Sequence, residues 1–457
     1  MASIVICGAG IAGISAAYFL AHNGARDIVL VDERAPLSLT SDKSTECYRN
    51  WWNDAAMVAL MNRSIDLLDD LARARANVFH LNRRGYLYVT ADKSRIAEFM
   101  RAGQQAESFG AGKLRVHSEL DVGNWKLDVG ERYVQHPTSN FQFPNTGADL
   151  ILDRALIREQ FPYLSERVVA VLHARRCGWL SAQTLGMDLL EQARARGVRF
   201  ISARVESIAV RDNAVRGVRL SNGTTIATEI FVNAAGPFLK NVGQMLGIEL
   251  PVFSELHQKI SFADALGAIP RDAPMLIWSD PQHLEFSDAE RALIAEADEL
   301  RGLLAECPAG AHTRPEGGAG STIALMLWAY HTPPVAEKFP LAFDPLYPQI
   351  VLRGMTTMLP ALEKYFERPP KPILDGGYYT KTRENRPLIG ALPVRGAFVI
   401  GALSGFGIMA SCASGELLAN YILGNSLPPY ARAFAPERYD DPAYRAWIEN
   451  QNESGQL

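Results

Sequence analysis

The chain has 457 residues, 48% of them hydrophobic and 21% charged, and a formal net charge of −4 at pH 7. Its length predicts more than one domain, and its composition is ordinary for a globular enzyme. The charge balance argues against a nucleic-acid partner, and no apolar run is long enough for a membrane span. Five widely spaced cysteines form neither a disulfide framework nor a zinc pattern, so we expect a reducing compartment, the cytoplasm, and no bound metal.

The chain begins with a strand and a glycine-rich turn. Residues 3–7, SIVIC, form a short β-branched run typical of a strand buried on both faces. The turn that follows contains Gly8, Gly10 and Gly13. Gly8 permits a tight turn, Gly10 lets the backbone approach a pyrophosphate, and Gly13 lets the next helix pack on the strand. This turn predicts a dinucleotide site.

A helix and a second strand complete the unit. The helix is expected over residues 14–23, and small residues around it let it lie close to a sheet. The strand, residues 27–33, ends in two acids, and Asp32 lies 19 residues after Gly13. At this spacing Asp32 is expected to bind the ribose hydroxyls, with Glu33 as its competitor, and an acid here disfavours NADP.

Two later segments return to the same kind of structure. Residues 178–236 predict an amphipathic helix and then strands, with turns at Asp212-Asn213 and Asn222-Gly223. The last of these strands runs into VNAAGPF. Residues 397–424 predict a strand, a glycine-containing turn and a helix rich in small residues. The dinucleotide-binding domain is therefore expected to be assembled from separate segments of the chain. In an NAD dehydrogenase the corresponding strands and helices follow one another in one compact unit.

Four blocks in this order resemble the FAD-dependent D-amino acid oxidase superfamily, particularly its sarcosine oxidase, glycine oxidase and dimethylglycine dehydrogenase branch. They are the N-terminal fingerprint with Asp32, VNAAGPF, YYTKTRENRPLIG and GALSGFGIMASCASGELLA. The resemblance implies FAD as cofactor, with backbone and small side chains around it. The residues that it places at the cofactor are Gly8, Gly10, Ile11, Ala12, Gly13, Asp32, Glu33, Ser44, Thr45, Val205, Ala235, Gly236, Gly405, Phe406, Gly407, Ile408 and Met409.

The family oxidises a C–N bond of an amine by hydride transfer to flavin N5, so the resemblance implies this reaction on a secondary amine or amino acid. Arg49, in STECYRNWW, resembles the arginine that pairs with the substrate carboxylate, since a guanidinium offers two parallel hydrogen bonds. A salt bridge to Glu46 is the alternative. Trp51 and Trp52 either line an amine pocket or pack in the core.

Further candidates lie in the middle and C-terminal parts of the chain. Tyr379, next to Tyr378, occupies a position that faces the flavin in relatives, with a surface position as the alternative. His257 and Lys259 fall on one face of an expected strand. That face is either the substrate cavity, with Lys259 promoting reaction with oxygen, or solvent. Tyr330 and His331 are weaker candidates.

Some residues depart from the family's pattern. Gly377 stands where monomeric sarcosine oxidases have the cysteine that tethers the flavin, and no histidine tether is evident, so non-covalent FAD is expected. Met409 replaces a lysine that helps to hold the substrate carboxylate, which favours a larger or less anionic amine than sarcosine. Residues 281–320 predict a surface helix and then a Gly/Pro-rich loop, either a lid or a disordered insertion.

The fold class expected is α/β, with a Rossmann-like FAD-binding domain and a second domain built on a mixed β-sheet. Residues 1–85, 151–240 and 372–457 are assigned to the FAD-binding domain, and residues 86–150 and 241–371 to the substrate-binding domain. Electrons would pass to oxygen or another acceptor. Two alternatives stay open: oxidation of a C–O bond of a 2-hydroxy acid, and a non-catalytic flavin-binding subunit of a hetero-oligomer.

Overall fold

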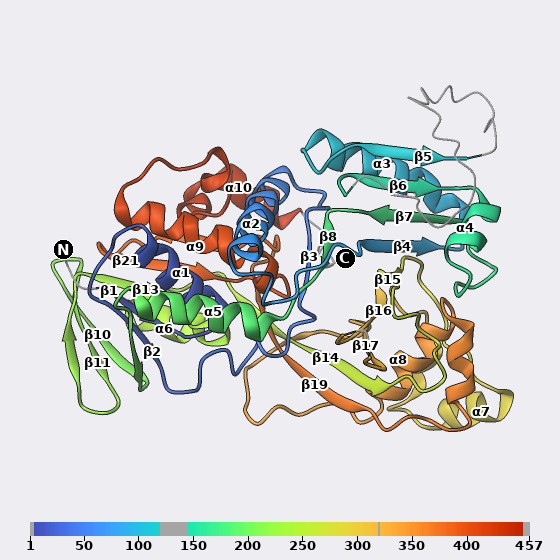
Figure 1. Cartoon of the computed structure of the whole chain (residues 1–457). Helices are drawn as coiled ribbons and strands as arrows, with labels where there is room; N and C mark the ends of the chain where they lie inside the picture. Colours follow the sequence, from blue (N-terminus) through green and yellow to red (C-terminus); the bar gives the residue numbers. More distant parts are fainter. Residues whose placement is uncertain (1–3, 119–144, 319, 451–457) are drawn as a thin grey trace.

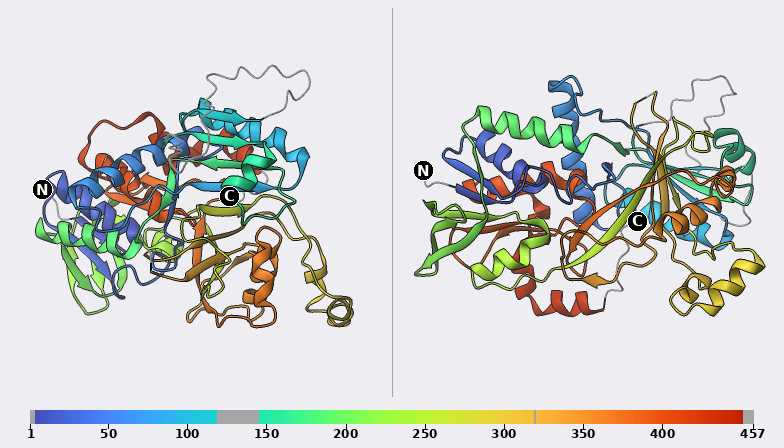
Figure 2. Two further views of the ribbon diagram at one scale, coloured as in Figure 1. Left: turned by 45° about the vertical axis from the view of Figure 1, so that its right-hand side comes forward. Right: turned by 90° about the horizontal axis from the view of Figure 1, so that it is seen from below.

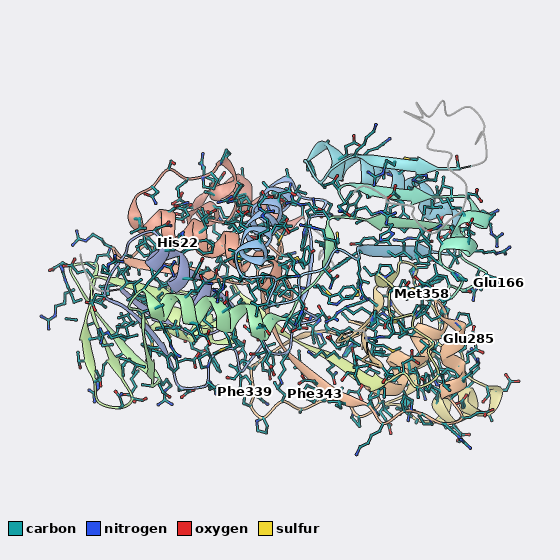
Figure 3. All side chains as sticks on the ribbon, viewed as in Figure 1. His22, Glu166, Glu285, Phe339, Phe343 and Met358 are labelled. Atoms are coloured by element: carbon teal, nitrogen blue, oxygen red, sulfur yellow. The ribbon has the colours of Figure 1, made fainter. Side chains whose placement is uncertain are left out.

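The computed structural model describes residues 4–118, 145–318 and 320–450. Figure 1 shows two large sheets side by side, one surrounded by helices and one with helices against its outer parts, and Figure 2 gives two further views. Side chains pack between the helices and sheets of both halves (Figure 3).

The first sheet has six strands in the order β20-β21-β13-β1-β2-β9, and only β20 runs antiparallel to its neighbour. Ile6 of β1 pairs with Leu30 of β2 and with Val232 of β13. The apolar runs are buried on both faces, as expected for a parallel sheet. The strands are β1 (Ile4–Cys7), β2 (Ile28–Asp32), β9 (Arg199–Ser202), β13 (Ile230–Asn233), β20 (Leu388–Ala391) and β21 (Ala397–Gly401).

Different elements cover the two faces of this sheet. Ile4 and Ile6 pack with the helices on one face, and Val5 packs with a three-stranded sheet and a short helix on the other. Helices α1 and α9 approach closely, since a Cβ on Gly415 would lie 2.5 Å from Oγ of Ser15, and Ser15 donates to the carbonyl of Ser411 at 2.7 Å. The covering elements are α1 (Ile11–His22), α2 (Ala55–Ala74), α5 (Ala182–Ala195), α9 (Gly407–Leu423), α6 (Leu239–Met245), β10 (Val205–Arg211), β11 (Ala214–Leu220) and β12 (Thr225–Ala227).

The second sheet has ten strands of mixed direction, in the order β18-β14-β17-β16-β15-β4-β7-β6-β5, with β19 also paired to β14. Leu87 and Val89 of β4 join a core that includes helix α8 (Tyr347–Thr356), so Tyr86 and Tyr88 face the other side of the sheet. The strands are β4 (Tyr86–Thr90), β5 (Leu114–His117), β6 (Ala148–Ile151), β7 (Ala170–Ala174), β14 (Phe253–Ala263), β15 (Met275–Trp278), β16 (Ala311–Pro315), β17 (Ile323–Leu327), β18 (Pro334–Val335) and β19 (Ile373–Lys381).

The remaining elements are a short two-stranded sheet, further helices and 3₁₀ helices. Strand β3 (Cys47–Arg49) pairs with β8 (Cys177–Trp179). The other helices are α3 (Ile96–Ser108), α4 (Arg154–Gln160), α7 (Asp288–Glu296), α8 (Tyr347–Thr356) and α10 (Pro442–Glu449). Short 3₁₀ helices span Lys93–Arg95, Gly236–Phe238, Arg301–Leu304, Pro360–Tyr365, Pro429–Ala433 and Pro436–Asp440. In the described part of the chain, no helix is both long and apolar enough to cross a membrane.

The expected fold class is confirmed, and so are the two turns. Asp212 and Asn213 both have positive φ and connect β10 to β11, and Gly223, also with positive φ, lies between β11 and β12. The expected domain bounds stay a prediction. Strands β7 and β19 belong to the larger sheet, although those bounds assign them to the FAD-binding segments.

The Gly/Pro-rich segment expected to be a lid or a disordered insertion instead contains β16, an inner strand of the larger sheet. Its charged residue, Arg314, is fully buried because it pairs with the carboxylates of Glu46 and Glu316. The polar, Gly/Pro-rich composition of this segment therefore led to the wrong expectation of a loop where the structure has a buried strand.

Candidate active site

The glycine turn brings three segments of backbone together. Gly8 has a φ of +113°, and a Cβ there would lie 2.3 Å from the carbonyl oxygen of Ala234. A Cβ on Gly13 would lie 1.9 Å from the carbonyl oxygen of Gly8. Only glycine allows β1, β13 and α1 to approach so closely.

Of the two acids that follow β2, Asp32 points back to this turn. Its carboxylate accepts from the backbone N–H of Ala9 at 2.8 Å and of Arg34 at 2.9 Å. Glu33 instead pairs with Arg34 at the surface and lies 3.5 Å from Arg204. This orientation favours Asp32 over Glu33 as the residue beside the ribose.

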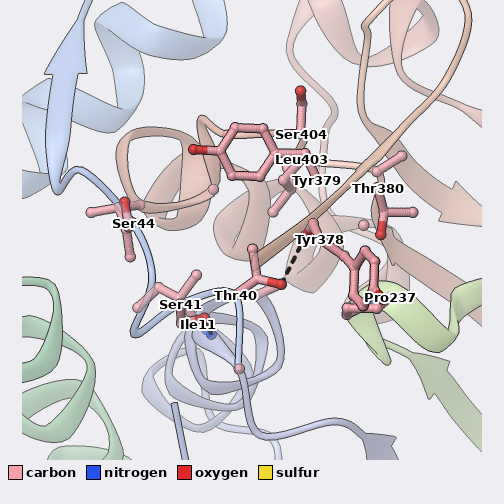
Figure 4. Close-up of a pocket in the computed structure, with 18 of the residues that line it drawn as sticks. Ile11, Thr40, Ser41, Ser44, Pro237, Tyr378, Tyr379, Thr380, Leu403 and Ser404 are labelled. Carbon is pink, nitrogen blue, oxygen red and sulfur yellow. Dashed lines mark hydrogen bonds between the residues drawn. The ribbon is translucent and has the colours of Figure 1, made fainter. Parts of the chain in front are cut away.

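A first cavity lies where two helices begin (Figure 4). Neither Gly10, before α1, nor Phe406, before α9, caps its helix through a side chain. The first residues of both helices, including Ile11 and Gly407, line this cavity, so the positive end of each helix dipole faces it. This suits a pyrophosphate and the electron-rich edge of a flavin. The lining residues are Gly10, Ile11, Ala12, Thr40, Ser41, Ser44, Ala234, Gly236, Pro237, Tyr378, Tyr379, Thr380, Ile400, Gly401, Ala402, Leu403, Ser404, Gly405, Gly407 and Ile408.

Other residues expected at the cofactor lie around this cavity. Gly236 has a φ of +55° and lines it, whereas Ala235 is the next residue back along the chain. Val205 is buried at the start of β10, close to the end of β2, because Ala203 donates to the carbonyl of Asp32. The cradle of small residues and helix ends fits a dinucleotide.

The loop before β3 is held by two cations, a half-buried lysine and a fully buried arginine. Lys259 Nζ donates to the carbonyl of Ser44 at 3.0 Å. Arg314 donates to the carbonyl of Thr45 through Nε at 3.1 Å and through Nη2 at 2.7 Å. Burial lowers the pKa of Lys259, with partial compensation from Asp375. Lys259 does not line either cavity, and Arg314 was missed because its segment was expected to be a loop.

A second cavity of about 680 Å³ adjoins the first, and both Tyr379 and Gly405 line both of them. Three of the four expected catalytic residues, Arg49, His257 and Tyr379, line this second cavity, as does Met409. Aromatic residues form a large part of the wall, beside charged residues that include Glu98 and Glu384. The aromatic lining residues, besides histidines, are Trp51, Trp52, Tyr86, Tyr88, Phe99, Trp278, Trp328, Tyr330, Tyr347, Tyr379, Phe406 and Trp447.

Arg49 is buried and held from two sides. Its Nη1 donates to the hydroxyl of Tyr88 at 2.7 Å, and its guanidinium lies 4.3 Å from the centre of the Trp52 ring. Trp52 in turn packs edge-on against Phe406, the residue before α9. The alternative partner, Glu46, lies against Arg314 and accepts from a backbone N–H of α5. Arg49 is thus positioned beside the expected flavin site.

His257 and Tyr379 form a stacked pair, with ring centres 3.9 Å apart. His257 Nε2 lies 2.8 Å from a carboxylate oxygen of Glu255, which also binds Lys381 at 3.1 Å. Burial lowers the pKa of His257, although Glu255 opposes the shift, and burial raises the pKa of Tyr379. Both rings are therefore neutral walls at neutral pH.

Several lining residues escaped the sequence analysis because no local pattern marks them. His312 belongs to the misread strand β16, and Trp447 to α10, a segment given no role. Arg386 pairs with Asp54 at 2.6 Å on another side of the cavity. Within the described ranges, no group of three or more His, Cys, Asp or Glu side chains is placed to hold a metal ion.

Comparison with curated proteins gives distant relatives. The chain is 26% identical over 280 residues to mitochondrial dimethylglycine dehydrogenase from Rattus norvegicus, and 25% identical to that from Homo sapiens. The alignments cover 60% of this chain but 28% of each relative. This chain therefore matches less than a third of the length of these relatives.

Solved structures show the same fold over nearly the whole chain. L-proline dehydrogenase from P. horikoshii superposes with a TM-score of 0.72 at 20% identity, covering 96% of this chain and 98% of that chain. Iminodiacetate oxidase from Chelativorans sp. BNC1 gives 0.69 at 16% identity, with 95% and 98% covered. Glycine oxidase from Bacillus cereus ATCC 14579 gives 0.67 at 16% identity, with 93% and 95% covered.

Residues 3–421 match the family described as FAD dependent oxidoreductase, DAO. The match includes the glycine turn, nearly all of α9 and every residue that lines the two cavities except Trp447. It confirms the expected family, the FAD cofactor and the oxidoreductase class. The chain belongs to the DAO family of FAD-dependent oxidoreductases.

Proposed function

We propose that this chain oxidises a C–N bond of a secondary amine or amino acid. The observation that carries the proposal is the junction of the two cavities at Tyr379 and Gly405, with the buried guanidinium of Arg49 in the larger one. FAD bound in the first cavity supplies the hydride acceptor. Dimethylglycine dehydrogenase, glycine oxidase and iminodiacetate oxidase, which this chain resembles, support an amine or amino acid as substrate.

Arg49 binds the substrate carboxylate in this proposal. Its fork is already ordered by Tyr88 and Trp52, so little side-chain entropy is lost on binding. The aromatic residues, including Tyr379, give the cavity apolar surface against which an amine can pack. Met409 lines the same cavity, and the size and aromatic character of this cavity favour a larger amine than sarcosine.

We propose that the residues expected to contact FAD do so in and around the first cavity. The positions at the starts of α1 and α9 would meet the cofactor through helix ends, and the others through loops and strand ends. Those at the helix starts are Gly10, Ile11, Ala12, Gly13, Gly407, Ile408 and Met409. The role of Lys259 in oxygen reactivity stays a prediction. Its contact with Ser44 supports a role in holding the loop that borders the flavin site.

We further propose that the FAD is bound non-covalently. Gly377 has no side chain, and a Cβ there would lie 3.1 Å from Cβ of Lys43. Cys47 directly follows the loop before β3, which borders the proposed flavin site. Its thiol, however, donates to the carbonyl of Thr45 at 3.1 Å, and burial raises the pKa of this thiol. A buried neutral thiol is a poor nucleophile. The five free buried thiols also favour a reducing compartment, the cytoplasm.

The proposal is tested by anaerobic reduction of the purified yellow protein. The protein is mixed with N-methyl amino acids, D- and L-amino acids, polyamines and 2-hydroxy acids, and the flavin band is followed. Bleaching by an amine or amino acid is expected. Bleaching by 2-hydroxy acids alone would replace the proposal with C–O oxidation, and no bleaching by any compound, with dithionite still effective, would favour a non-catalytic subunit. Readmission of air then separates an oxidase from a dehydrogenase.

A further inference from the structure

The cavity side of the larger sheet carries one row of residues in register. Lys259 pairs with Leu327, Leu327 with His312, His312 with Ile277, and Ile277 with Tyr88. Residues paired across neighbouring strands point to the same face. The four residues from Leu327 to Tyr88 line the second cavity, so His312 lies in the middle of its wall.

The hydrogen bond of His312 determines which ring nitrogen is an acceptor. Nδ1 lies 2.8 Å from the carbonyl oxygen of Gly310, which can only accept, so Nδ1 carries the proton. Nε2 then presents a lone pair, and no described residue donates to it. The side chain is partly exposed on the cavity wall. Burial lowers the pKa of His312 to about 4, so the ring stays neutral at neutral pH.

The same row gives the spacing from His312 to the carboxylate site. Neighbouring strands lie about 4.8 Å apart, so His312 and Tyr88, two strands apart, are separated by about 10 Å at the backbone. Tyr88 holds Arg49, and the electrostatic influence of Arg49 reaches His312. Because Arg49 and His312 both line the second cavity, an amino acid bound there can turn its carboxylate toward Arg49 and its nitrogen toward His312.

We propose that Nε2 of His312 accepts a hydrogen bond from the N–H of the substrate amine, and that the chain therefore favours primary and secondary amines over tertiary ones. The inference rests on the proposed function. A neutral tertiary amine has no N–H, so it would leave the desolvated acceptor without a partner. Sites built to bond a substrate N–H reject analogues that lack it.

The first test measures binding without oxidation. Pyrrole-2-carboxylate and furan-2-carboxylate are planar carboxylates that differ in having N–H or O at one ring position. We expect the FAD-loaded protein to bind the pyrrole compound at least about tenfold more tightly in calorimetric titrations. We expect His312→Leu to abolish this preference and His312→Asn, which keeps an acceptor, to retain part of it. Equal affinities in the wild type, or an unchanged preference in His312→Leu, would overturn the inference.

The second test measures anaerobic flavin reduction with N-methyl and N,N-dimethyl forms of the same amino acid. The wild type is expected to be reduced at least about tenfold more efficiently by the secondary amine, and His312→Leu about equally by both. A similar preference in both proteins would overturn the inference while leaving C–N oxidation intact. If no amine reduces the wild type, the proposed function fails and the inference fails with it.

A matched control separates this effect from general damage. His283 is exposed, and His283→Leu makes the same exchange away from both cavities. It is expected to keep the wild-type preference. The flavin spectrum and the melting temperature report whether each variant is folded and loaded with FAD.

Discussion

The two cavities are built in different ways. The first lies where the backbone of several segments meets, with the turn at Gly8 close by and the first residues of α1 and α9, Ile11 and Gly407, in its lining. The second is formed by side chains from many elements, with Arg49 and His312 among aromatic walls. A backbone cradle needs small residues at fixed spacing, whereas a side-chain cavity needs only that distant residues meet. The first therefore suits a cofactor shared by a family, and the second a substrate particular to one member.

The largest effect is expected from Gly13→Ala in the backbone cradle. Its Cβ would lie 1.9 Å from the carbonyl oxygen of Gly8, and neither backbone can move without disturbing β1. We expect a cost of about 3 kcal/mol or more and loss of bound FAD, measured by flavin absorbance and thermal unfolding. Gly302→Ala, which meets nothing within 4 Å, is the control. Full FAD content in Gly13→Ala would contradict the close approach of α1.

Arg314→Met tests the boundary between the cavities. The fully buried guanidinium neutralises Glu46 and Glu316 and holds the carbonyl of Thr45. Its removal leaves buried acceptors unpaired, so we expect the free energy of unfolding to fall by about 3 kcal/mol in denaturant titrations. Arg301→Met breaks an exposed ion pair and is expected to cost less than about 1 kcal/mol. Equal losses in the two variants would remove Arg314 from this role.

Arg49→Ala tests the side-chain cavity itself. This substitution removes the buried guanidinium proposed to bind the substrate carboxylate, so substrate binding is expected to weaken about 100-fold. The flavin spectrum is expected to stay unchanged. The measurement is the substrate concentration that half-saturates anaerobic flavin reduction. Arg49→Lys keeps the charge and is expected to recover part of the loss. If the wild type reacts equally with an amino acid and its amide, Arg49 does not bind the carboxylate.

A smaller, pH-dependent effect is expected in the larger sheet. Burial lowers the pKa of His173 to about 3, against about 6.5 in an unfolded chain. As the pH falls, the unfolded chain therefore binds a proton at His173 before the folded chain does. The neutral His173 thus contributes its full share of the free energy of unfolding above pH 6.5, and this contribution is lost as the pH falls toward 3. When the pH is lowered from 7 to 5, the free energy of unfolding is expected to fall by about 1–2 kcal/mol less in His173→Gln than in the wild type. Denaturant unfolding at the two pH values measures this difference. An equal change for the exposed control His283→Gln would contradict this assignment.

The first cavity could be predicted from the sequence because its determinants are local. Gly8, Gly13 and Asp32 fall at spacings that the backbone requires, and their order along the chain already indicates the fold. For the second cavity the sequence supplied Arg49, His257 and Tyr379 through resemblance to a family. It did not supply His312 or Arg314, since their segment has the composition of a loop and only pairing with β15 and β17 shows it to be a strand.

Membership of the larger sheet was also hard to predict. Strand β7 is short and follows a helix, as strands of the FAD-binding half do, yet it pairs with β4 and β6. Strand β19 contains the start of the YYTKTRENRPLIG block, Tyr378 to Lys381, yet it pairs with β14 along its whole length. Strand partners depend on long-range contacts that local patterns do not carry.

The most direct measurement of the central claim compares an N-methyl amino acid with the 2-hydroxy acid of the same carbon skeleton. Each is mixed anaerobically with the purified yellow protein, and the rate of bleaching of the flavin band is followed. Oxidation of a C–N bond at the joined cavities predicts rapid bleaching by the N-methyl amino acid and none by the hydroxy acid. Bleaching by the hydroxy acid alone would contradict it.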